Sequence, residues 1–137
     1  MTTARDAART SVHEASHAAI AMAFRCKVLS ATLEPQLDGA LGAVSYKPSR
    51  RGFRNAVIAL AGIEAERLFF GIADPNLADR ESARAALGTW DAAALDEAFS
   101  TARALVEQHR PAIERVAEAL IARRTLDARD LAELVAP

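Results

Sequence analysis

The spacing of apolar residues changes along the chain and predicts a helix, a pair of strands and then a series of helices. In residues 4–25 apolar side chains recur every three or four positions, which is typical of an amphipathic helix. In residues 28–34 they alternate with polar ones, as in a half-buried strand that ends before Pro35. Residues 41–48 form a plausible returning strand after a turn-rich segment. An isolated hairpin is marginally stable, so we expect this one to pack against the helices.

From residue 51 onward the periodicity is helical and the helix ends carry the usual residues. The expected elements are a helix over 52–70 closed by Gly71, a short helix from Asn76 as N-cap to Gly88, a long helix capped by Thr89, a helix with Pro111 in its first turn, and a final short helix after Thr125. No repeat or linker interrupts them. The sequence therefore predicts one domain over residues 1–137, α+β and mainly helical, with a small hairpin or sheet and a bundle of about five helices after it. We expect residues 1–10 to be a frayed N-terminus.

Composition and charge limit the classes of function. The chain has 137 residues, 51% of them apolar and 26% charged, which suits one globular core. Its net charge of −1 argues against a nucleic-acid partner. The single cysteine, Cys26, cannot form an internal disulfide and fits a reducing compartment. No apolar run approaches the roughly 20 residues of a membrane span, and residues 1–10 lack the apolar core of a signal peptide. We therefore expect a cytoplasmic protein without a membrane span.

Two histidines near the start of the chain have the spacing of a metal-binding pair. His13 and His17 are four residues apart, so on a helix their side chains lie on one face, one turn apart. Both rings can then bind one zinc ion, and Glu14 lies beside it in position to act as a general base. The same letters have a simpler interpretation, because Ser11 and Glu14 also fit a helix capping box. A zinc site needs a third protein ligand, which this motif does not supply.

Four segments, in the same order, resemble the zinc protease domain of the FtsH-type ATP-dependent proteases. They read HEASHAAIA, ALGAVSY, ALAGIEAERLFFG and ARALVEQHRPAIERVAEALIARRTLDARDLAEL, and together they extend from about Ser11 to Val135. Only the first segment is specific by itself, and the resemblance rests on the order of all four. It implies the fold of that domain, a Zn²⁺ cofactor and the hydrolysis of peptide bonds.

The resemblance also implies a third zinc ligand. In this family the ligand is an aspartate that opens a helix soon after a Phe-Gly element, and here the helix after Phe70 and Gly71 contains one aspartate, Asp79. A carboxylate near a helix N-terminus is also favoured by the helix dipole alone, which is the structural alternative for this residue. Asp91, in a similar local pattern, is the rival ligand. Glu66 takes the place of a family glutamate that we expect to support the site without touching zinc.

Several features depart from the family pattern. Ser16 replaces a glycine of the zinc helix, and the stretch between the aspartate helix and the closing helices is reduced to Gly88 and Thr89. The only lysines, Lys27 and Lys47, lack the context of a phosphate-binding loop, so we expect no ATPase in this chain. A relative of the protease domain without its own motor is expected to act on peptides or unfolded protein segments. A separate ATPase partner and a homo-oligomer remain open.

The leading hypothesis is a zinc-dependent metalloendopeptidase in which His13, His17 and Asp79 hold zinc and Glu14 is the catalytic base. We expect the substrate to lie extended along the edge of the 28–34 strand. Tyr46, the only tyrosine, receives no role. The alternative hypothesis is a zinc-stabilised, weakly active or inactive adaptor or regulatory protein. A nucleic-acid-binding helical domain has little support from the charge or from any motif.

Overall fold

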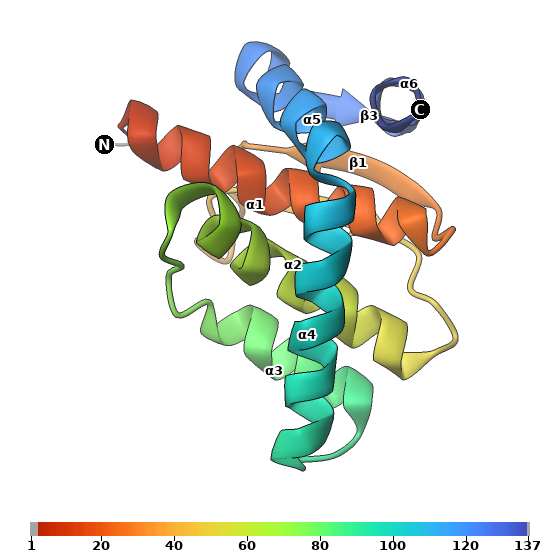
Figure 1. The fold of residues 1–137 in the computed structure, drawn as a ribbon. Helices are drawn as coiled ribbons and strands as arrows, with labels where there is room; N and C mark the ends of the chain where they lie inside the picture. Colours follow the sequence, from red (N-terminus) through yellow and green to blue (C-terminus); the bar gives the residue numbers. More distant parts are fainter. Residues whose placement is uncertain (1–2, 137) are drawn as a thin grey trace.

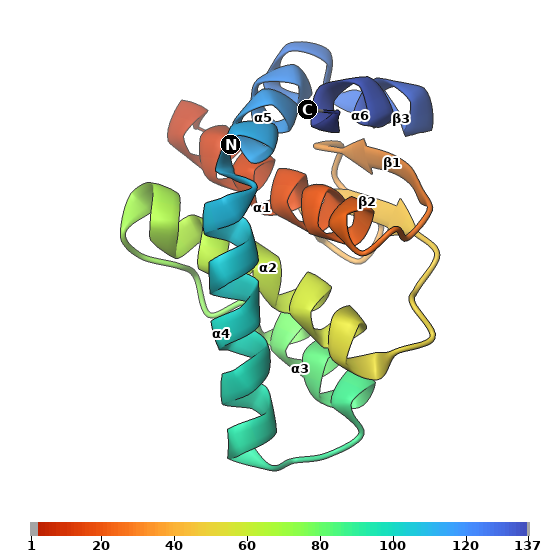
Figure 2. The same cartoon turned by 45° about the vertical axis from the view of Figure 1, so that its right-hand side comes forward.

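The computed structural model describes residues 3–136 and has the α+β, mainly helical fold that the sequence predicts (Figure 1). A small antiparallel sheet lies beside the first helix, α3 and α4 pack against α2, and α5 and α6 pack on α1 and the sheet (Figures 1 and 2). In chain order the elements are α1 (Ala4–Ala23), β1 (Val28–Thr32), β2 (Ala43–Tyr46), α2 (Gly52–Phe70), α3 (Leu77–Leu87), α4 (Ala92–Gln108), α5 (Arg110–Arg123), β3 (Thr125–Asp127) and α6 (Ala128–Val135).

Helix α1 begins at Ala4, and its first turn is held by a capping box. The Thr3 hydroxyl accepts a hydrogen bond from the Asp6 amide, and the Asp6 carboxylate accepts one from the Thr3 amide. This reciprocal capping box satisfies two of the amides that a helix start leaves free. Residues 4–10 are therefore helical, as the apolar spacing over residues 4–25 predicts, and they are not frayed, while residues 1 and 2 lie outside the described part of the chain.

The sheet has three strands in the order β2-β1-β3, so the first strand in the sequence is the central one. β1 pairs antiparallel with β2, as the hairpin prediction requires, and also antiparallel with β3. The sequence predicts that the final helix begins directly after Thr125, but residues 125–127 form β3, in which Leu126 is fully buried opposite Ala31. A strand of three residues is too short to show an alternation of apolar and polar positions, which explains why it was missed.

Helix α2 is the centre of the core. All its residues from Ala56 to Glu66 are buried, because α1, α3 and α4 pack around it. It ends at Gly71, whose φ of +80° is the left-handed conformation that glycine adopts without strain. Where another group comes close to such a buried helix, only a short side chain fits. Gly62 is such a position, because the His13 ring lies against it.

The caps of two helices differ from the predicted ones, although α3 begins directly after Asn76 as predicted. α4 is capped by the Asp91 carboxylate, which accepts a hydrogen bond from the Ala93 amide, and not by Thr89. Asn76 precedes α3 in the left-handed conformation, with φ +47°, and its side chain caps nothing. Pro111 lies in the first turn of α5, as predicted. Across the described residues, no helix is both long and apolar enough to cross a bilayer.

Candidate metal site

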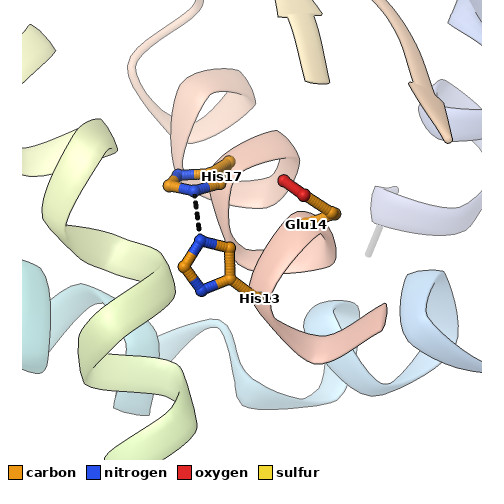
Figure 3. Close-up of side chains that lie close together, drawn as sticks. All are labelled: His13, Glu14 and His17. Atoms are coloured by element: carbon orange, nitrogen blue, oxygen red, sulfur yellow. Dashed lines mark hydrogen bonds between the residues drawn. The ribbon is translucent and has the colours of Figure 1, made fainter. Parts of the chain in front are cut away.

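The two histidines of α1 point their Nε2 atoms toward a common point (Figure 3). His13 Nδ1 donates to Glu66 Oε2 at 2.9 Å, and His17 Nδ1 donates to the Ile58 carbonyl at 2.8 Å. Each of these bonds fixes the orientation of a ring and leaves its Nε2 facing inward, where the two Nε2 atoms are 3.0 Å apart. Second contacts of this kind orient histidine ligands in metal sites. The helical spacing of the pair therefore brings both rings to one point, as the sequence suggested.

Asp79, in the first turn of α3, reaches the same point from the other side of the cleft. Its Oδ2 lies 2.8 Å from His13 Nε2 and 3.4 Å from His17 Nε2. The rival aspartate, Asp91, is exposed and occupied as the cap of α4. Of the two candidates, the structure brings only Asp79 to the histidines.

The three inward atoms have the spacing that a tetrahedral zinc site needs. Ligand atoms about 2.0–2.1 Å from a zinc ion lie about 3.3 Å from one another in a tetrahedron. The three distances here are 2.8, 3.0 and 3.4 Å, so shifts of a few tenths of an ångström suffice. The His13, Glu14 and His17 side chains also bring one donor atom each within 4.8 Å of one another, a group that can hold a metal ion. The Asp79 carboxylate, with Oδ2 at 2.8 and 3.4 Å from the two histidine Nε2 atoms, lies within the same limit and can also contribute an oxygen to such a group.

Glu14 is buried yet makes no hydrogen bond to any part of the described chain. Its side chain is directed to the same cleft as the histidines (Figure 3). Gly42 makes room for it, because a Cβ there would lie 3.1 Å from Glu14 Oε2 and 2.7 Å from the Thr32 carbonyl oxygen. A carboxylate that faces the cleft beside the histidine pair and has no hydrogen-bond partner among the described residues is free to accept a proton.

The Glu66 carboxylate is held by residues from two other parts of the chain. Its Oε1 accepts a hydrogen bond from Arg9 Nη2 at 3.1 Å, and its Oε2 accepts one from Asn76 Nδ2 at 2.8 Å. Arg9 also pairs with Asp74 at 3.3 Å, which connects α1 to the loop before α3. Glu66 thus accepts a hydrogen bond from His13 and is itself held in place by two other residues. No sequence pattern pointed to Arg9, and the pattern around Asn76 suggested a different role, helix capping.

The charges around His13 favour its protonated form in the absence of a metal. Burial alone opposes a charged ring, but the hydrogen bonds to Asp79 and Glu66 outweigh it and raise the pKa of His13 to about 10. Burial likewise opposes a charged Asp79, yet the hydrogen bonds from His13 and His17 hold the pKa of this carboxyl well below its usual range. Burial raises the pKa of Glu14, against the opposing effect of the two histidines. A bound cation would take the place of the proton on His13 between the same negative groups.

The site opens into a cleft of about 630 Å³. Its walls include the histidine face of α1, the start of α3 and the segment from Ala40 to Tyr46 that leads into and along β2. Tyr46, to which the sequence assigned no role, lies in this wall. His109 lies at the junction of α4 and α5, and Cys26 is half-buried against the core; neither lines the cleft.

Comparison with known proteins adds no identification. No protein-family model matches the sequence, and no curated protein sequence matches it. The resemblance to the FtsH-type protease domain therefore stays a prediction from the four sequence segments.

Proposed function

We propose that this protein is a zinc-dependent metallopeptidase that hydrolyses peptide bonds in peptides or unfolded protein segments. One observation carries the proposal: three atoms of the types that bind zinc, from His13, His17 and Asp79, converge beside a buried, unpartnered Glu14 carboxylate. Two histidines and one carboxylate are a known ligand set of catalytic zinc sites, which keep a fourth position open. The resemblance to the FtsH-type domain supports the same activity.

Glu14 is the residue that moves the proton in this mechanism. A zinc ion held by His13, His17 and Asp79 would act as a Lewis acid, which would polarise the scissile carbonyl and lower the pKa of water. Glu14 takes that proton on its carboxylate and passes it to the departing amine. Its raised pKa brings it closer to the pH at which a base both accepts and returns a proton.

The substrate backbone has a free strand edge to bind in the cleft, but not the edge that the sequence suggested. The 28–34 strand corresponds to β1, the central strand, which is paired on both sides over residues 30–32 and has no continuous free edge. β2 is paired only with β1, and its residues line the cleft beside Glu14. An extended peptide added to β2 would be held mainly by backbone hydrogen bonds, which suits unfolded segments of varied sequence.

Replacement of the base separates the peptidase from the adaptor hypothesis. Glu14→Gln should keep its zinc, measured by metal analysis of the purified protein, because Glu14 is not one of the three proposed ligands. Its rate of cleavage of an unfolded substrate should fall by about 10²- to 10⁴-fold relative to the wild type, since proton transfer contributes about that much. If zinc-loaded wild type and Glu14→Gln are equally unable to cleave, the peptidase proposal fails and the zinc-stabilised adaptor remains.

A further inference from the structure

One end of the cleft leads onto a surface that carries only positive charge. Two long segments of the chain, residues 15–33 and 39–63, contain no aspartate or glutamate. They hold six basic residues, which we call the basic patch: Arg25, Lys27, Lys47, Arg50, Arg51 and Arg54. Five of the six are exposed and Arg54 is partly buried. The other eleven lysines and arginines share the rest of the chain with all 18 acidic residues.

The basic patch is one surface because the turn after α1 and the segment between β2 and α2 are joined. The Lys47 amide donates to the Lys27 carbonyl at 2.9 Å, and the Arg54 guanidinium lies over the Phe24 ring, 5.3 Å from its centre. Both segments lie at the same side of the molecule in the two views (Figures 1 and 2). The end of α3, which touches Gly52, adds Arg84 in its last turn and no acidic residue.

None of the six residues forms an ion pair with any part of residues 3–136. Elsewhere on the surface, arginines are commonly paired with a carboxylate, as Arg110 is with Glu114 and Arg124 with Glu34. The positive charge of the basic patch is thus not neutralised within the protein. Unpaired charge of one sign attracts and orients a partner of opposite charge.

Strand β2 connects the catalytic residues to this surface. Its start is next to Gly42, which contacts Glu14, and its end leads through Tyr46 to Lys47. The distance along the strand from Ala43 to Lys47 is about 13 Å, or four residues of an extended chain. The lining at the other end of the cleft includes Asp6, Asp74 and Arg9, and Arg9 is paired with Asp74 and Glu66. Among the described residues, that end therefore offers no unpaired cation, in contrast to the basic patch.

We propose that the cleft selects extended peptides that carry a cluster of acidic residues about four or more positions to one side of the bond to be cleaved. A peptide lying along the free edge of β2 passes from Glu14 onto Lys47 and Arg50, where aspartate or glutamate side chains meet the unpaired cations. This inference rests on the proposed function for the position of the scissile bond. It adds the substrate class, which neither the zinc site nor the strand edge specifies.

The test measures peptide binding without cleavage, using the full chain with Glu14→Gln and zinc. Fluorescence anisotropy compares three labelled peptides with one common central sequence: one with three acidic residues on its N-terminal side, one with them on its C-terminal side, and one with the matching amides. One acidic peptide should bind about tenfold more tightly than the amide peptide, and the other should not, because only one end of the cleft is basic. The advantage should shrink as salt is raised.

Two double variants with the same change of charge provide the control. Lys47→Gln with Arg50→Gln should abolish the preference for the acidic peptide, whereas Arg103→Gln with Arg129→Gln should keep it. Arg103 and Arg129 are exposed on α4 and α6, outside the basic patch. Thermal melts followed by circular dichroism establish that both variants are folded.

Equal binding of all three peptides would overturn the inference, and so would a preference that survives replacement of Lys47 and Arg50. It would also be overturned if a short RNA displaced the acidic peptide at a lower concentration than unlabelled peptide does. Cleavage by the wild type distinguishes this inference from the proposed function. Cleavage without any preference for an acidic flank leaves the peptidase and removes the selectivity. Selective binding of the acidic peptide without any cleavage by the wild type leaves the selectivity and removes the peptidase.

Discussion

The ring of His13 is enclosed between groups from three helices, and one of its neighbours is a residue with no side chain. A Cβ added at Gly62 of α2 would lie within 2.6 Å of both ring nitrogens. Glycine in a helix interior costs about 1 kcal/mol relative to alanine, so its presence here is explained by the space that the ring needs. The packing of α2 against α1 thus sets the position of a metal-binding atom.

Gly62→Ala should therefore weaken zinc binding by at least about tenfold, because His13 can hold its Nε2 toward Asp79 only where no side chain stands at residue 62. Competition with a chelator of known affinity measures the change. Circular dichroism should show that the metal-free variant keeps its helices, since alanine favours a helix more than glycine does. Wild-type affinity in a folded Gly62→Ala protein would show that the ring does not need this space.

Because of His13, zinc binding at the proposed site should depend on pH. Its pKa is raised from 6.5 to about 10 in the folded, metal-free protein, so it contributes stability that is complete below pH 6.5 and is lost as the pH rises through 10. Zinc binds the deprotonated ring. The apparent zinc affinity should therefore increase from pH 6.5 toward 10, and at pH 8 binding should release close to one proton from His13. Calorimetry in two buffers of different ionisation enthalpy counts that proton, and an affinity that is constant over this range would contradict the prediction.

Among the elements, the loop between α2 and α3 sets the position of Asp79 relative to the two histidines. Asn76 directly precedes α3 and has its backbone in the left-handed conformation. Its side chain donates to Glu66 on α2, which in turn accepts from His13 on α1. One hydrogen-bonded chain thus links the three helices that carry or support the site. Arg9 completes it from α1 by pairing with both Glu66 and Asp74.

Loss of the Asn76 side-chain amide should lower zinc affinity by about 10- to 100-fold. The amide holds Glu66, which orients His13, and the loss of such outer contacts usually weakens metal binding by about this much. Asn76→Gly tests this cleanly, because glycine accepts the same backbone conformation and lacks only the side chain. Asn76→Ala removes the amide as well and adds backbone strain, so it should be equally weak or weaker in binding zinc. Wild-type zinc affinity in Asn76→Gly would show that only the backbone conformation matters at this position.

For the whole molecule, the site joins parts of the chain that are far apart in sequence, so a bound metal should stabilise the fold. At a free zinc concentration 1,000 times the dissociation constant, binding adds about 4 kcal/mol to the free energy of unfolding. For a domain of this size that raises Tm by roughly 10 to 15 °C. The metal acts as a crosslink between α1 and α3, which otherwise meet in the site through the Asp79 carboxylate.

Chelation with EDTA should therefore lower Tm by that amount, measured by calorimetry, and added zinc should restore it. Asp79→Ala should show little response to either treatment, because it leaves two of the proposed ligands. Asp91→Ala is the matched control: it removes a helix cap, lowers stability by about 1 kcal/mol, and keeps the full response to zinc. If Asp91→Ala abolishes the response and Asp79→Ala retains it, the third ligand is assigned to the wrong aspartate.

The sequence alone determined the features that depend on local spacing. His13, Glu14 and His17 share a helix, so their relative positions follow from its 3.6-residue period, and the helix ends at Gly71 and Gly88 follow from residues that favour left-handed backbone. The pattern of apolar positions likewise predicted the helices over 52–70 and 77–87 and the β1–β2 hairpin. Asp79 was named from a resemblance, not from spacing.

Only the tertiary structure decided which distant groups meet, because burial and register depend on the whole chain. Residues 125–127 become a strand only because Leu126 is buried opposite Ala31, and this makes β1 central and leaves β2 with the free edge. The Asn76 amide donates a hydrogen bond to Glu66 because the loop places it next to that carboxylate. Rules for helix caps consider only local sequence and do not predict this contact. The spacing of the three inward atoms, and the space that Gly62 leaves for one of them, are set by the packing of α1, α2 and α3.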